Sequence, residues 1–231
     1  MNTLLSTIFS PIRAFNQLKT EKFSMMSLLM ILLLVLVNLI LMMPLTEKIT
    51  QLTMESMPVG SAQTDMAMEL VYKLRYVMMI GAVFTSVIML LLYALILYLV
   101  ARVSKVNLEF MKIFQLMVCC YIAVVIGSFV NTALLLMRGI DAIQTMYDAS
   151  LIGLNVFTSV EKIGLPGFVF LSNINPFQLW FVALICIGIA VIAEIKPAKA
   201  IIIGVVFWLI TILFPVLSAY VSQLTMAKVG L

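Results

Sequence analysis

The sequence predicts an all-α membrane protein, a helical bundle that crosses the bilayer five times. Hydrophobic residues make up 64% of the 231 residues, charged residues only 10%, and histidine is absent. One helical crossing needs about 20 apolar residues, because the hydrocarbon core of a bilayer is about 30 Å thick. Five apolar runs reach that length, at residues 23–43, 77–100, 113–137, 174–193 and 200–221. Residues 23–231 are therefore expected to form one membrane domain, with only short connections between spans.

Residues 1–22 are expected to form a cytoplasmic juxtamembrane helix. Ser10 followed by Pro11 is a good helix start, since a capping hydroxyl precedes a proline at the first helical position. Ile12, Phe15 and Leu18 recur on one face of that helix. Three basic side chains are candidates for contact with lipid headgroups: Arg13, Lys19 and Lys22. The simpler alternative is an ordinary anchor beside the first span.

Two connections are long enough to hold structure of their own. In residues 45–76, a break at 58–61 precedes a helix that Ser61 can cap and that extends the second span beyond the membrane. In residues 138–173, the stretch 151–160 is apolar but too short to span, which predicts an interfacial or re-entrant segment. Residues 194–199 are short and contain Pro197, which predicts a tight antiparallel hairpin between the last two spans. Pro215 is expected to bend the last span.

The distribution of charge predicts a cytoplasmic N-terminus and an outside C-terminus. With this threading, eight of the 14 basic residues but three of the ten acidic residues lie inside. Basic residues accumulate in cytoplasmic loops, so this orientation fits the charges better than its reverse. The positive-inside rule also explains the net charge of +4 without a nucleic-acid partner. Arg75, beside the second span, is the main residue against the threading.

The centres of the five runs contain uncharged polar groups but no ionisable Asp, Glu, Lys, Arg or His. Since such groups usually mark proton relays and ion paths, a proton-coupled pump is disfavoured. The candidate polar positions are Asn38, Tyr93, Gly127, Ser128 and Asn131. Gly127 and Asn131 are four residues apart, so a small residue and an amide share one helix face, which favours close helix contact. The residues leave two interpretations open: interhelical packing, which is favoured, and a polar cavity for a lipid headgroup or solute.

The sequence offers few residues that could catalyse a reaction. Without histidine, His-based triads and His metal sites are excluded. Cys119, Cys120 and Cys186 all lie in apolar runs, lack metal-ligand spacing, and are interpreted as buried apolar side chains. No metal and no cofactor are predicted. A membrane-embedded enzyme would have to use loop carboxylates such as Asp141 and Asp148.

Several local strings, together with the order of spans, resemble the bacterial branch of the Ypt-interacting-protein (Yip) family of five-span membrane proteins. The strings are Ser10-Pro-Ile-Arg-Ala-Phe15, Leu92-Tyr-Ala-Leu-Ile-Leu-Tyr98 with Ala101-Arg102, Asn175-Pro-Phe-Gln-Leu-Trp180, and Ile187-Gly188 followed by Lys199-Ala200 and Trp208. The resemblance implies an N-in, C-out protein of the bacterial inner membrane. Eukaryotic members bind small GTPases, but their DLYGP-like string is not visible here, so GTPase binding is not carried over.

Two functions are therefore weighed. The leading hypothesis is a non-enzymatic scaffold or assembly factor that binds lipids, membrane-protein partners or further copies of this chain. The alternative is a transporter, channel or lipid-moving protein in which Asn38, Asn131 and Tyr93 line a cavity between spans.

Overall fold

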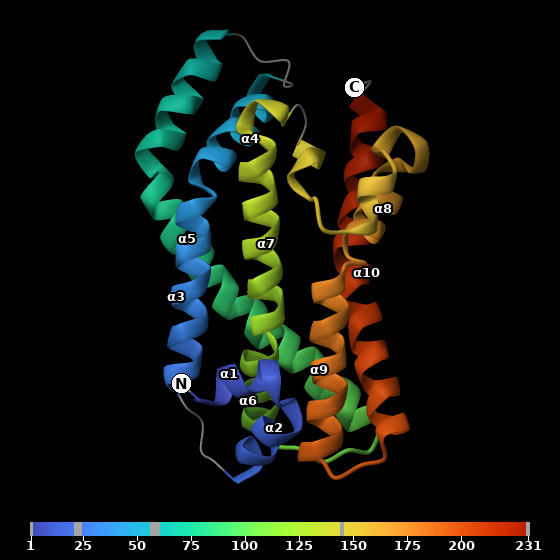
Figure 1. The fold of residues 1–231 in the computed structure, drawn as a ribbon. Coiled ribbons are helices and arrows are strands. Elements are labelled where there is room, and N and C mark those ends of the chain that lie inside the picture. Colours follow the sequence, from blue (N-terminus) through green and yellow to red (C-terminus); the bar gives the residue numbers. More distant parts are fainter. Residues whose placement is uncertain (1, 21–24, 56–60, 144–145, 230–231) are drawn as a thin grey trace.

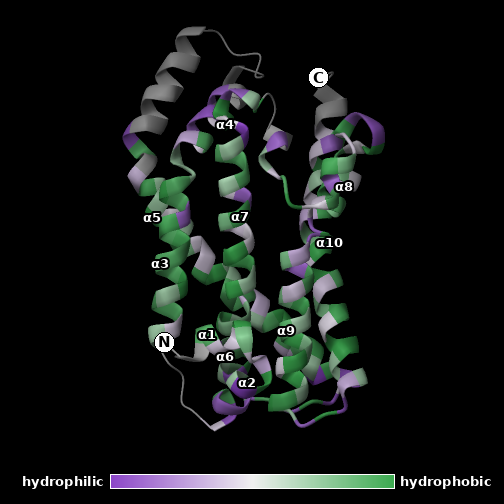
Figure 2. Cartoon of the chain, in the orientation of Figure 1, coloured by the Kyte–Doolittle hydropathy of each residue, from purple (hydrophilic) through white to green (hydrophobic). Residues whose placement is uncertain are grey.

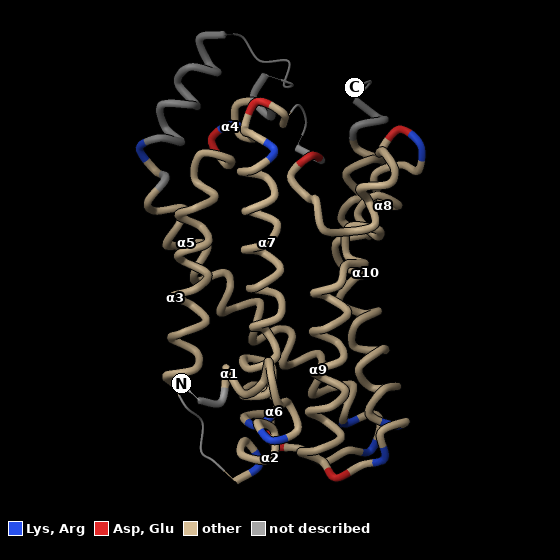
Figure 3. Tube along the Cα trace, viewed as in Figure 1, with Lys and Arg blue, Asp and Glu red and all other residues tan. Residues whose placement is uncertain are grey.

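The computed structural model describes residues 2–20, 25–55, 61–143 and 146–229, and the regular elements among them are helices (Figure 1). The helices form an elongated bundle with an apolar middle (Figure 2). Charged residues gather at its two ends and leave a charge-free zone between them (Figure 3). This layering is the one that a membrane-spanning bundle requires, since unpaired charges are costly in hydrocarbon.

The five predicted runs all coincide with helices. Three helical stretches are long and apolar enough to cross a membrane by themselves: Tyr76–Val103, Phe110–Arg138 and Pro197–Thr225. Two bent helix pairs, Met25–Leu41 with Met43–Gln51 and Val160–Ser172 with Pro176–Ile192, bring the number of candidate spans to five. The all-helical membrane fold is therefore confirmed, with three to five candidate spans among the described residues.

The first and second candidate spans are extended beyond the predicted runs. The first consists of α3 (Met25–Leu41) and α4 (Met43–Glu55), with a bend of 54° between Met25–Leu41 and Met43–Gln51. The second is the long helix α5 (Ser61–Val103), which begins at Ser61 and continues without interruption into the apolar run. The prediction that a helix from Ser61 extends the second span is therefore confirmed.

The third and fifth candidate spans follow the sequence closely. The third comprises α6 (Phe110–Cys120) and α7 (Ile122–Arg138), which meet at Tyr121. The fifth is α10 (Pro197–Val229), and a tight turn joins it to α9 (Pro176–Ile192), as the hairpin prediction required. Glu194 in this turn has a φ of 53°, and the Ile195 N–H donates to the carbonyl of Ala190, which closes the end of α9.

The fourth candidate span differs from the prediction. The run at 174–193 corresponds to α9, but a further helix, α8 (Val160–Ser172), precedes it and packs on α10. Asn175 adopts an extended conformation before Pro176, and its side-chain oxygen accepts a hydrogen bond from the Gln178 N–H at 2.8 Å. This cap starts a new helix at Pro176, so α8 and α9 remain separate and meet with a bend of 43°. The stretch 151–160, predicted to be interfacial or re-entrant, holds the short 3-10 helix η3 (Leu154–Phe157) and irregular backbone up to the start of α8 at Val160, and its position relative to the membrane stays a prediction.

The N-terminal segment forms two helices where one was expected. They are α1 (Asn2–Phe9) and α2 (Pro11–Thr20), and α2 starts at Pro11 as the Ser10–Pro11 pair predicts. Phe15 and Leu18 are buried, whereas Ile12 is 60% exposed. In Figure 1, α1 and α2 lie against the bundle at the end that also holds the α9–α10 turn. The segment is therefore part of the packed core and not a separate layer.

The core is centred on α6 and α9. Every residue from Ile113 to Cys120 is buried, because α6 is covered by α2, α3, α5 and α9. By contrast, only 17% of the most apolar stretch of α5 is buried. The bundle thus has a closely packed half around α6, α7 and α9 and an α5 side that faces the surroundings.

Candidate functional site

Asn38 of α3 is buried against α7, where its partner is Thr132. The Thr132 hydroxyl lies 3.0 Å from the Asn38 Oδ1 and 2.9 Å from the Ser128 carbonyl. The Asn38 Oδ1 and the Ser128 carbonyl oxygen both accept, so the single proton of the Thr132 hydroxyl is shared between these two acceptors. The contact joins α3 to α7 within the apolar zone.

Thr132 was missed by the sequence reasoning. A signal existed, because Ser128 and Thr132 are four residues apart and therefore lie on one helix face.

Asn131 serves a different contact from Asn38. Its Nδ2 donates to the carbonyl of Ala149 at 2.9 Å, and its Oδ1 accepts from the N–H of Leu151 at 2.8 Å. The side-chain amide thus pairs with the backbone of the connection between α7 and α8 as a neighbouring strand would. The structure does not bring the amides of Asn38 and Asn131 together.

Gly127 allows α7 to approach α9 closely. A Cβ built at Gly127 would lie 2.7 Å from the Cβ of Phe177 and 2.8 Å from its Cγ, a distance that real side chains do not reach. Two further glycines have the same role: a Cβ at Gly188 would collide with Leu116, and one at Gly204 would collide with Cys186. These three glycines hold α9 against α7, α6 and α10.

Tyr93 lines a cleft of about 640 Å³ between α5, α10 and the junction of α8 and α9. Its ring packs edge-on against Phe207, with the ring centroids 6.2 Å apart. The cleft is lined by Met89, Leu92, Tyr93, Ile96, Asn173, Gln178, Thr211, Ile212, Phe214, Pro215 and Ser218. Asn38, Asn131 and Tyr93 were predicted to line one cavity between the spans. Of these three residues, only Tyr93 lines this cleft.

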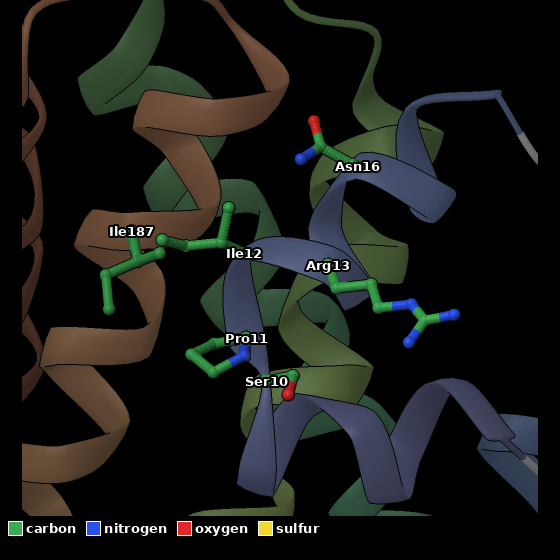
Figure 4. Close-up of a pocket in the computed structure, with 6 residues that line it drawn as sticks. All are labelled: Ser10, Pro11, Ile12, Arg13, Asn16 and Ile187. Atoms are coloured by element: carbon green, nitrogen blue, oxygen red, sulfur yellow. The ribbon is translucent and has the colours of Figure 1, made fainter.

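The three basic candidates for lipid contact differ in their surroundings. Arg13 is exposed beside a shallow hollow of about 480 Å³ on α2 and α9, and Figure 4 shows its guanidinium extending away from Ile12 and Ile187. Lys19 forms an ion pair with Glu194 in the α9–α10 turn. Lys22 lies outside the described residues.

A fourth basic residue holds α2 in place. The Nζ of Lys112 donates to the carbonyls of Leu18 and Lys19 at 2.8 and 3.2 Å. A cation at this position also interacts favourably with the negative end of the α2 dipole. Lys19 and Lys112 therefore tie the N-terminal helices to α6 and to the α9–α10 turn.

Within the described residues, no group of three or more His, Cys, Asp or Glu side chains is placed to hold a metal ion. Cys119 and Cys120 are buried, Cys186 is half-buried, and all three are free thiols.

A family model matches most of the chain. The Yip1 domain matches residues 5–219, from α1 to the last third of α10, and so includes the N-terminal helices. No curated protein and no solved structure matches the chain. The match covers most of the sequence and agrees with the multi-pass helical architecture. The chain therefore belongs to the Yip family of integral membrane proteins.

Proposed function

We propose that this protein is a non-enzymatic scaffold or assembly factor of the bacterial cytoplasmic membrane that binds membrane-protein partners and lipids. In the threading that fits the charges, the end with α2 and the α9–α10 turn faces the cytoplasm. The polar positions Asn38 and Asn131 and the small residue Gly127 act in helix packing, because their contacts join α3, α7, α9 and the α7–α8 connection. Ser128 supports this packing through its backbone carbonyl, which accepts from Thr132 within α7. Arg13 is the residue proposed to contact lipid headgroups.

One observation carries the partner-binding part of this proposal. Gly127, Gly188 and Gly204 each face a neighbouring side chain, but a Cβ at Gly81 of α5 would meet no atom within 4 Å. Thr85, one turn later, is also exposed. Small residues four apart on a transmembrane helix let another helix approach closely. The face formed by Gly81 and Thr85 is therefore the proposed docking face for a helix of a partner protein.

The proposal is tested by photo-crosslinking in native membranes. A photoreactive side chain at exposed Ile88 of α5 should capture a discrete membrane-protein partner in the parent protein. Gly81→Ile should reduce that adduct strongly, and Gly81→Ala should retain most of it. Leu99→Phe, which enlarges an exposed side chain near the other end of α5, is the matched control and should leave the adduct unchanged. Equal adduct yields in the parent and Gly81→Ile proteins would refute the docking face.

The Tyr93 cleft favours a second candidate, a lipid-moving protein. The cleft opens between α5 and α10 within the apolar zone and carries several polar groups. Movement of labelled lipid across proteoliposomes, with and without Tyr93→Phe, measures this activity directly. Movement at the protein-free rate would remove this candidate without affecting the scaffold proposal.

A further inference from the structure

The cleft at Tyr93 combines apolar walls with uncharged polar groups. Its walls include Met89, Leu92 and Phe214, and its polar side chains include Tyr93, Gln178 and Ser218. No Lys, Arg, Asp or Glu is among the lining residues. A charged ligand would therefore find no counter-ion, whereas an uncharged ligand with an apolar body and a few hydrogen-bonding groups fits this chemistry.

The hydrogen-bonding capacity of the lining is only partly used within the protein. The Thr211 hydroxyl donates to the carbonyl of Trp208 at 2.8 Å, and the Asn173 amide donates to that of Val169 at 2.8 Å. By contrast, the side chains of Tyr93, Gln178 and Ser218 make no hydrogen bond to any other residue that the structure describes. Tyr93 and Gln178 are half-buried and Ser218 is exposed, so all three groups are accessible to a partner from outside the chain, and such a partner is favoured because unpaired polar groups are costly in an apolar medium.

A backbone acceptor adds to this set. Pro215 has no N–H, so the carbonyl of Thr211, four residues earlier in α10, lacks its helical donor. Thr211 and Pro215 both line the cleft. Donors and acceptors therefore occur together along the cleft, which matches a ligand that carries both carbonyl and hydroxyl oxygens.

We propose that the cleft binds the glycerol-ester part of an acylglycerol lipid together with one of its acyl chains. The Tyr93 hydroxyl and the Gln178 amide donate to the ester carbonyls, and the acyl chain lies along the apolar wall. The inference rests on the lipid-binding part of the proposed function. Phe214, one of the lining residues, is 76% exposed, so the cleft is open to the surroundings of the bundle and is not closed off by protein.

The test uses the full-length protein in nanodiscs and a diacylglycerol with a photoreactive acyl chain. Labelled peptides from residues 89–96 and 211–218 are expected in the parent protein. Tyr93→Phe should lower their yield about 3–10-fold, as loss of one buried hydrogen bond predicts. Tyr220→Phe makes the same change at an exposed tyrosine of α10 outside the lining and should leave the yield unchanged.

Diacylglycerol and phosphatidylcholine share the glycerol-ester part, and competition with each unlabelled lipid shows which of them the cleft binds. If unlabelled diacylglycerol and phosphatidylcholine both compete, the glycerol-ester part is recognised in either lipid. If only diacylglycerol competes, the site selects the neutral lipid. Failure of both to compete, or labelling spread evenly over the helices, overturns the proposal.

A second variant, whose folding is measured directly, blocks the cleft. Leu92→Trp fills the cleft from its lining, and thiol-reactive dye monitors unfolding through buried Cys119 and Cys120. Undiminished labelling in a folded Leu92→Trp protein also overturns the proposal. The partner adduct at Ile88 is measured for the parent protein and for Tyr93→Phe in native membranes, so that failure of the lipid site is distinguished from failure of the scaffold function.

Discussion

Substitution of Gly127 by alanine tests whether close glycine contacts hold the bundle together. The added Cβ would lie 2.7 Å from the Cβ of Phe177, whereas carbon atoms in contact normally stand about 3.5–4.0 Å apart. Either α7 and α9 separate by about 1 Å or Phe177 leaves its position. Overpacking of this kind costs about 1–3 kcal/mol, so Gly127→Ala should destabilise the fold.

Gly81→Ala is the matched control, since it adds the same methyl group to a lipid-facing helix. No atom lies within 4 Å of the new Cβ. Alanine favours a helix over glycine by up to about 1 kcal/mol, so this variant should be neutral or slightly more stable. The same substitution is thus predicted to have opposite effects at two positions.

Thermal unfolding in detergent measures the difference, with the buried thiols of Cys119 and Cys120 as probes of unfolding. For a chain of this length, 1 kcal/mol corresponds to about 2–4 °C in apparent Tm. Gly127→Ala should therefore lower Tm by several degrees. Phe177→Ala in the same chain removes the Cγ and Cδ2 contacts but keeps the Cβ, so it should relieve part of the clash and the double variant should lose less than the sum of the single variants. Equal Tm values for Gly127→Ala and Gly81→Ala would refute the reasoning.

Three further substitutions test contacts of the bundle. Thr132→Val removes the partner of the Asn38 amide and should cost about 0.6–1.7 kcal/mol, with a double-mutant cycle against Asn38→Leu showing coupling of that size; additive effects would contradict the contact. Lys112→Met removes the donor at the end of α2 and should weaken its docking by about 1–3 kcal/mol, seen as faster amide hydrogen exchange in residues 11–20; unchanged exchange would argue against that role. Lys105 has a φ of 55°, so Lys105→Gly should stabilise the protein by about 0.5–1 kcal/mol in the thermal assay, and a lowered Tm would contradict this expectation.

The positions of the spans were predictable because an apolar run of sufficient length has few alternatives to a membrane helix. The helix α8 was not. Residues 160–172 contain Gly164, Pro166 and Gly167, which locally favour a loop. In the structure, Gly164 takes a φ of 72° and breaks the helix there, so Pro166 lies near the start of the following helical segment, where its missing N–H costs little. Packing on α10 stabilises this arrangement, and such packing is not visible in local sequence.

The residues of the polar site could be predicted from the sequence, but their hydrogen-bond partners could not. Asn38 and Asn131 stood out because amides in apolar runs need hydrogen bonds. Their partners depend on which helices meet and on the path of the α7–α8 connection, which are properties of the whole fold. Tyr93 was likewise singled out, but its neighbours come from α10 and from the junction before α9, far away in sequence.

Both proposed binding sites lie on α5, and the geometry of that helix determines how far they are separated. Gly81 and Tyr93 are twelve residues apart on one continuous helix, which corresponds to about 18 Å along the axis and a rotation of about 120°. A helix docked at Gly81 therefore does not lie over Tyr93 itself. Leu92, however, lines the cleft and is eleven residues from Gly81, only about 20° away around α5, so a docked helix that runs along α5 reaches one wall of the cleft. Coupling between the sites can therefore pass through Leu92. If Gly81→Ile abolishes the partner adduct but leaves lipid labelling at Tyr93 unchanged, the sites are independent; a parallel loss of labelling means that the two sites are coupled through α5.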